Sequence, residues 1–130
     1  MSRSLILCLL LTALPALSAD PRSDYLMHCS GCHMPDGNGF APVVPTLHSV
    51  TGRMAATAKG RDYLIRVPGV AQAPVNDETL TAILNWMLIE FSSDTLPQDF
   101  EPLTVEEVSR SRVRLLADPL RYRALHFPEY

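Results

Sequence analysis

Cysteine is scarce in this sequence, and its scarcity excludes two classes of protein. The 130 residues include three cysteines, of which Cys8 lies in an apolar N-terminal stretch and is given no function. Only Cys29 and Cys32 remain. A framework of several disulfides is therefore excluded, and so is a zinc site built from two cysteine pairs.

Positive charge is also scarce. Lysine and arginine total 11 against 14 acidic residues, which gives a formal net charge of −3. Removal of the N-terminal stretch would take Arg3 with it and leave ten basic residues and a charge of −4. The sequence therefore lacks the basic face expected of a nucleic-acid-binding protein. A mildly acidic surface suits partners with basic patches, and it is also ordinary for a small domain.

No stretch after residue 19 is apolar enough to span a bilayer. Residues 1–19 have the pattern of a secretory signal, with Arg3, an apolar segment from Leu5 to Leu17 and small residues before Asp20. We therefore expect a cleaved signal peptide and a periplasmic protein without a membrane span. An uncleaved membrane anchor is the alternative.

Regular strands are missing from the pattern as well. No segment alternates convincingly between polar and apolar residues, no internal repeat occurs, and 11 prolines interrupt the chain. Helical spacing instead predicts helices near residues 23–33, 60–67, 77–91 and 104–117. Thr104 and Glu107 form a capping box at the start of the last one. We expect an all-α fold with proline- and glycine-rich loops.

The sequence is organised around Cys29-Ser30-Gly31-Cys32-His33. This C-x-x-C-H pattern is typical of covalent haem attachment, because thiols one helical turn apart can bond to two vinyl groups of one porphyrin. The histidine that follows can bind the iron as the proximal axial ligand. The motif therefore predicts one covalently bound haem c.

Two other interpretations of the cysteine pair are weaker. A thioredoxin-like redox dithiol needs a βαβ context, which the sequence does not contain. A zinc site needs a second pair of ligands. The sequence also lacks a Ser/His/Asp pattern and a phosphate-binding loop, so no catalytic residues are predicted and we do not expect an enzyme.

Beyond the motif, the sequence resembles the class I c-type cytochromes. Pro45-Thr46-Leu47-His48 begins twelve residues after His33, and Gly52-Arg53 places its arginine twenty residues after it. The resemblance implies that the Pro45 carbonyl accepts a hydrogen bond from His33, that Leu47 packs on the haem and that Arg53 lies near a propionate.

The resemblance also implies a domain division and a function. Residues 20–95 would form a cytochrome c domain, followed by an extension with one helix at residues 96–130. The implied function is single-electron transfer between redox partner proteins, in the service of a periplasmic dehydrogenase or a respiratory chain. The alternatives are an open-site haem protein that binds a small ligand and a haem subunit of a larger redox enzyme.

The sequence departs from this family at the sixth iron ligand. The expected distal methionine is missing, because Ala73-Pro74 stands where Met-Pro would be. Met54 is the distal candidate, while Met87, Gln72, His48, a second chain and an open or water-bound site stay as alternatives. Two further methionines, Met27 and Met34, flank the motif and are expected to pack in the core.

Overall fold

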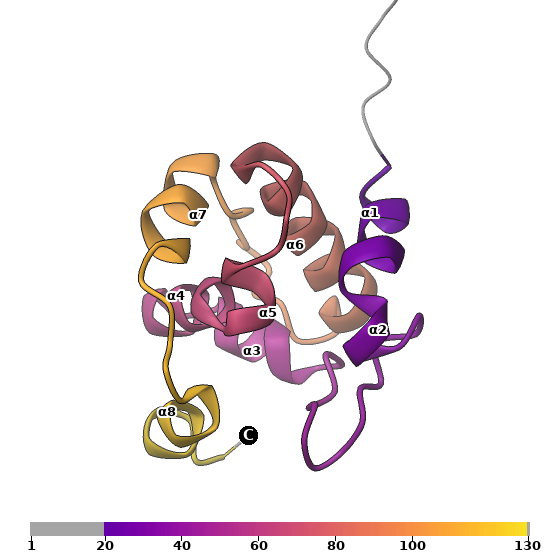
Figure 1. Cartoon of the computed structure of the whole chain (residues 1–130). Helices are drawn as coiled ribbons and strands as arrows, with labels where there is room; N and C mark the ends of the chain where they lie inside the picture. Colours follow the sequence, from indigo (N-terminus) through magenta and orange to yellow (C-terminus); the bar gives the residue numbers. More distant parts are fainter. Residues whose placement is uncertain (1–19, 130) are drawn as a thin grey trace, which may run out of the picture.

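The structure is a computed structural model that describes residues 20–129, so the predicted signal peptide lies outside the described residues. Figure 1 shows how the helices of this part of the chain are arranged. They are α1 (Pro21–His28), α2 (Ser30–His33), α3 (Val50–Ala55), α4 (Ala58–Arg66), α5 (Pro68–Ala71), α6 (Asp77–Ser92), α7 (Val105–Arg112) and α8 (Pro119–His126). Within residues 20–129 the only β-pairing is an isolated bridge between Phe40 and Val44, which confirms the all-α prediction.

Helix α1 packs across α6 through one aromatic side chain. Tyr25 is completely buried, and its ring lies 5.2 Å from that of Trp86 and 5.3 Å from that of Phe91. Its hydroxyl donates a hydrogen bond of 2.7 Å to the backbone carbonyl of Met34. One residue therefore joins α1, α6 and the chain just after the C-x-x-C-H motif.

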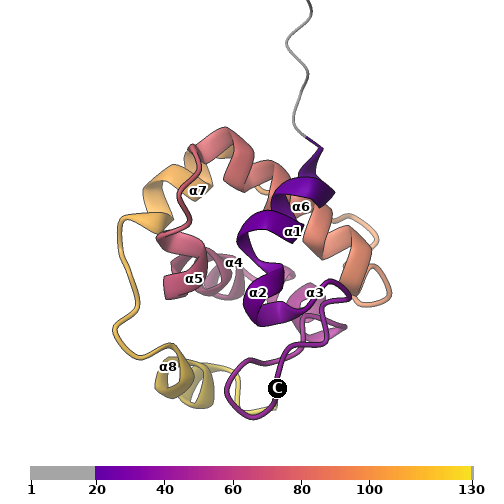
Figure 2. The same cartoon turned by 45° about the vertical axis from the view of Figure 1, so that its right-hand side comes forward.

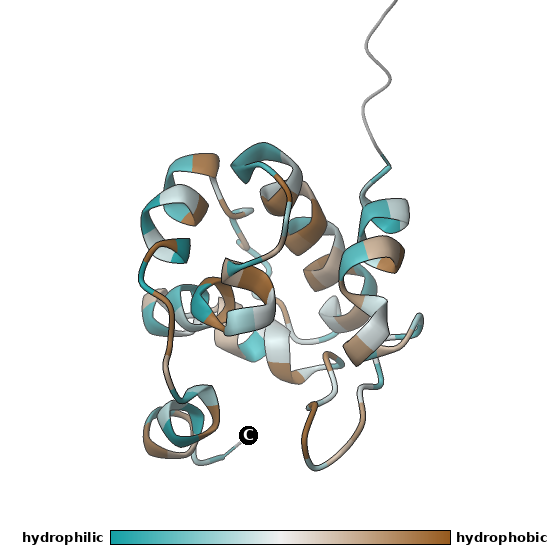
Figure 3. Ribbon diagram, viewed as in Figure 1, coloured by the Kyte–Doolittle hydropathy of each residue, from teal (hydrophilic) through white to brown (hydrophobic). Residues whose placement is uncertain are grey.

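Helix α6 forms as its sequence predicts. The Asn76 side chain caps it by accepting a hydrogen bond of 2.8 Å from the Thr79 N–H. The apolar residues of α6 turn toward the other helices (Figure 3). The buried members of this stripe are Leu80, Ile83, Leu84, Met87, Leu88 and Phe91.

The extension contains two helices, α7 and α8, where the sequence predicts one. The capping box at Thr104 and Glu107 is present, but α7 ends at Arg112 rather than near residue 117. Asp118 and Pro119 begin α8: the Asp118 carboxylate accepts the Arg121 N–H, and Pro119 occupies the first turn.

The extension belongs to the same core as the rest of the described chain. Leu103, Val108 and Leu116 are buried in the shared hydrophobic cluster. The Asn85 side chain of α6 pairs with both the N–H and the carbonyl of Leu103, at 2.8 and 3.0 Å. The expected boundary between residues 95 and 96 therefore does not separate two hydrophobic cores.

Arg112 of α7 fixes the short loop between α5 and α6. Its guanidinium donates to the carbonyls of Ala71, Ala73 and Val75, and it pairs with the Asp77 carboxylate at 2.7 Å. The hydrogen bond from Arg112 is the largest cause that lowers the pKa of Asp77. The loop that lacks the family's methionine is thus held by the extension.

Replacing Arg112 should destabilise this arrangement. Its side chain is 14% exposed. Arg112→Ala would remove the guanidinium donor from three carbonyls and the partner of Asp77, and it should lower the free energy of unfolding by about 2–4 kcal/mol. Denaturant unfolding of the purified protein measures the loss. Arg110→Ala, which removes an exposed arginine of the same helix, should cost less than about 0.5 kcal/mol; equal losses would contradict the interpretation.

The ion pair between Arg61 and Glu107 should make stability depend on pH. The hydrogen bond from Arg61 is the main cause that lowers the pKa of Glu107 below its ordinary value, and the pair is 2.7 Å apart. Because the pKa is lower in the folded state, the stabilisation is complete above the ordinary pKa of glutamate and is lost as the pH falls through the folded value.

Glu107→Gln should therefore lower the unfolding free energy by about 1–2 kcal/mol at neutral pH. It should also reduce the loss of stability between neutral and acidic pH. Urea unfolding at a series of pH values measures both effects. The exposed neighbour Glu106 provides the control Glu106→Gln; a wild-type pH profile retained by Glu107→Gln would refute the assignment.

Candidate functional site

A large apolar cavity occupies the space between the helices. Its volume is about 380 Å³, within the usual range of small-molecule sites, about 300–1,000 Å³. Walls come from α1 and α2, from the loop between α2 and α3, and from α3, α4, α5, α6 and α8. In Figure 2, α2 lies toward the front of the molecule, with α5 beside it and α8 below.

The C-x-x-C-H motif forms one wall of the cavity. Cys29 ends α1, and Cys32 and His33 belong to the single turn of α2, whose His33 N–H donates to the Cys29 carbonyl at 3.1 Å. All three side chains line the cavity, and both thiols are free. The helical turn places the two thiols and the imidazole together, as the sequence predicts.

The electrostatic surroundings keep His33 neutral. Burial lowers its pKa, and the nearby Pro45 carbonyl opposes this effect in part. The Nδ1 atom is nevertheless buried without a well-formed hydrogen bond, so the expected bond to Pro45 stays a prediction. A neutral imidazole at a cavity wall is the form that binds a metal.

The thiols do not resemble a redox dithiol or a zinc site. Burial raises the pKa of Cys29, and the adjacent Cys32 raises it further, whereas reactive cysteines have a lowered pKa. Within residues 20–129, no group of three or more His, Cys, Asp or Glu side chains could hold a metal ion. The cavity instead suits a large apolar group that bonds to both thiols.

The loop between α2 and α3 covers another side of the cavity. Pro45 and Leu47 both line it, as expected, and Leu47 is buried. The Leu47 N–H donates to the Gly37 carbonyl at 2.8 Å, while its own carbonyl accepts hydrogen bonds from Thr51 and Ser92. These bonds fix the apolar loop against α3 and α6.

Two methionine side chains reach the cavity. Met54 of α3, 2% exposed, and Met87 of α6 both line it, whereas Gln72 and His48 do not. His48 instead makes a hydrogen bond of 2.6 Å from its Nε2 to the Asp36 carbonyl.

The expectation that Met27 and Met34 pack in the core is wrong, because both are exposed. Helix α1 turns Tyr25 toward α6, and Tyr25 is its only buried residue.

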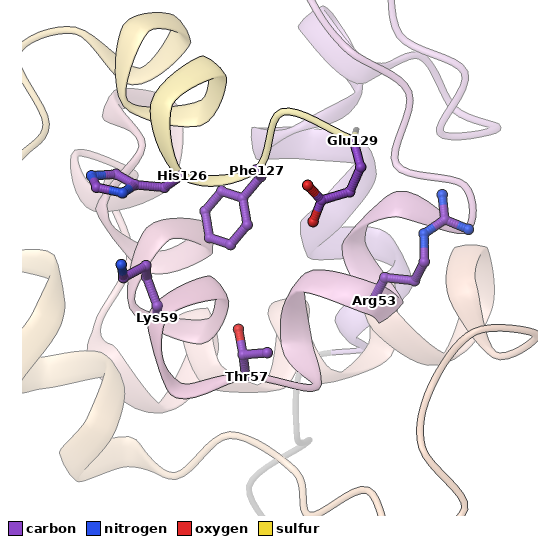
Figure 4. A pocket seen from close by; sticks show the side chains of 6 residues that line it. All are labelled: Arg53, Thr57, Lys59, His126, Phe127 and Glu129. Atoms are coloured by element: carbon purple, nitrogen blue, oxygen red, sulfur yellow. The ribbon is translucent and has the colours of Figure 1, made fainter.

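The structure does not bring Arg53 to the cavity. Arg53 is exposed on α3 and lines a separate hollow with Lys59, Phe127 and Glu129. Figure 4 shows its guanidinium directed away from the centre of that hollow. Its expected position beside a haem propionate therefore has no support from this geometry.

The extension supplies cavity residues that the sequence did not reveal. Pro119, Leu120 and Arg123 of α8 line the cavity, next to Tyr63 of α4. Nothing in the spacing of the tail residues identified Arg123 as a cavity residue. The capping signal at Asp118-Pro119 could have revealed α8.

The residues of the cavity fit a haem. Two thiols and an imidazole whose buried Nδ1 has no hydrogen-bond partner lie together on one wall, and most of the other lining residues are apolar. The Cys29 and Cys32 thiols would form the thioether bonds, and His33 would bind the iron.

Comparison with known proteins identifies relatives along most of the chain. No protein-family profile matches it. The chain is 31% identical over 134 aligned positions to a cytochrome c-552 of Thermus thermophilus, with 89% of this chain and 90% of the relative covered. A second cytochrome c-552 of Thermus thermophilus is 29% identical over 106 positions, with 68% of this chain and 81% of the relative covered. The similarity thus extends well beyond the haem-attachment motif.

Proposed function

The chain belongs to the c-type cytochromes, and on this basis we propose that it holds a single covalent haem c and carries single electrons between redox partner proteins. One observation carries the proposal: Cys29, Cys32 and His33 share one wall of an apolar cavity. A haem bound there supplies one iron that alternates between the ferric and ferrous states. The chain is an electron-transfer protein and not an enzyme.

The chain's own residues assist electron transfer in two ways. His33, kept neutral by burial, donates its imidazole nitrogen to the iron. The apolar walls exclude water, and Leu47, Met54 and Leu80 are among their buried side chains. Closely packed walls of this kind would keep the reorganisation between the two oxidation states small.

Electrons would enter and leave where the cavity meets the surface. Cys32 and Val43 line the cavity and are also exposed, so its mouth opens between α2 and the loop that follows. With residues 1–19 acting as an export signal, the mature chain would carry a charge of −4 and meet its partners in the periplasm. A dehydrogenase or a respiratory chain is the proposed source or acceptor of the electrons.

The sixth iron ligand decides between two versions of this function. Met54 is our proposed ligand, because its side chain lines the cavity and a thioether is a known axial ligand that raises the potential. An open site that binds a small ligand is the second candidate. It is favoured by the apolar wall of Leu64, Val67 and Val70, which offers no ligating atom.

Removal of the thiols tests covalent attachment. Cys29→Ser and Cys32→Ser should each leave at most one thioether bond, and the double variant should leave none. Haem retained on the denatured polypeptide, compared between variants at equal protein amounts, measures the effect. Ser30→Ala, a change between the two cysteines, should retain haem at the wild-type level. Haem that resists denaturation in the double variant would contradict the proposal.

Substitution of each cavity methionine tests the sixth ligand. Met54→Leu should abolish the ferric charge-transfer band of methionine ligation, lower the reduction potential and let the ferrous protein bind carbon monoxide rapidly. Met87→Leu, an equal change in the same cavity, should leave all three properties near those of the wild type. A wild-type protein that already binds carbon monoxide rapidly would instead favour the open site.

A further inference from the structure

The cavity lining contains one permanently charged side chain. Arg123 is the only lysine or arginine among the described lining residues, and none of these residues is an aspartate or glutamate. An arginine remains protonated in proteins, so the charge cannot be removed by a shift in its pKa. A cation at the edge of an apolar cavity is costly unless an anion accompanies it.

Arg123 lacks such an anion among the described residues. It is partly buried and makes no ion pair there, although four other arginines do: Arg61, Arg66, Arg112 and Arg114. Its charge does act on Tyr63, where it opposes the larger effect of burial, which raises the pKa of that phenol. Tyr63 is a neutral phenol and does not balance the arginine's charge.

Helix α8 is held in a defined position beside the cavity. The Tyr122 ring stacks on the Tyr63 ring at 5.8 Å, with 12° between their planes. Phe127 is buried just after α8, and the centre of its ring lies 5.6 Å from that of the Tyr63 ring. The Tyr63 hydroxyl donates to the Pro119 carbonyl at 3.4 Å. These contacts attach α8 to α4 and place the Arg123 side chain at the lining.

Helix α8 lies at one end of the cavity. Figures 1 and 2 both show α8 and the loop between α2 and α3 at the same end of the molecule. Val43 and Val44 of that loop line the cavity, as do Leu120 and Arg123 of α8. An occupant attached at Cys29 and Cys32 would have this end available for its polar edge.

We propose that Arg123 is the charge partner of a haem propionate and that the extension thereby completes the haem site. This inference rests on the proposed haem function. A guanidinium can form two parallel hydrogen bonds to one carboxylate, and it balances the charge of a carboxylate taken out of water. Arg53, to which the family resemblance gives this role, lies outside the cavity lining.

The test compares the reduction potentials of four variants of the haem-loaded protein. A cation near a propionate disfavours the extra positive charge of ferric iron, so its loss should lower the potential. Arg123→Gln should shift the equilibrium between ferric and ferrous protein roughly three- to tenfold toward ferric, about 28–59 mV for one electron. Arg123→Lys should recover most of the shift because it restores the charge.

Arg121→Gln provides the matched control. Arg121 lies on the same helix but is exposed and does not line the cavity, so this change removes an equal charge that water already screens. It should shift the equilibrium less than twofold. Arg53→Gln should behave like the control.

The possible outcomes separate this inference from the proposed function. A wild-type chain without covalent haem would overturn the function itself. Haem-loaded Arg123→Gln with the potential of Arg121→Gln would overturn only the role of Arg123. The role of Arg123 would also be overturned if the reduction potential fell as far in Arg123→Lys as in Arg123→Gln. A larger shift of the potential in Arg53→Gln than in Arg123→Gln would lead to the same conclusion. The near-ultraviolet dichroism of the tyrosines would report whether α8 stays in place.

Discussion

The structure depends on the packing of Tyr25 between α1 and α6. Its ring fills the space beside Trp86 and Phe91, and its hydroxyl binds the Met34 carbonyl directly after the haem-attachment motif. A buried aromatic ring with a satisfied hydroxyl combines a large hydrophobic contact with a fixed orientation. The two thiols and the imidazole therefore face the cavity because α1 is fixed on α6 in this orientation.

The cavity explains why the extension is part of the fold. The loop between α5 and α6 is short and lacks the ligand that the family resemblance leads one to expect. Arg112 holds this loop from α7, and Leu120 and Arg123 of α8 add to the wall. The same segment that seemed separable in the sequence thus shapes the environment of the proposed haem. The extension thus contributes both the charge of Arg123 and the apolar side chain of Leu120 to the cavity wall.

Much of the site could be predicted from sequence because its chemistry is local. The motif needs only one helical turn, and Asn76 and Thr104 cap their helices through contacts within three residues. Prediction was harder where the rotation of a helix determines which of its side chains face the cavity. Adjacent residues of a helix point about 100° apart. In α3, Met54 therefore lines the cavity, while Arg53, which the family resemblance places by its distance from His33, lies outside the lining.

The most direct test of the account is the intact mass of the denatured protein after export from cells that attach haem covalently, with the modified peptide then identified by fragmentation. The account predicts a chain that begins at Asp20 and carries the mass of one haem on the peptide that contains Cys29 and Cys32. A chain without added mass, or a haem mass on a peptide without these cysteines, would contradict it.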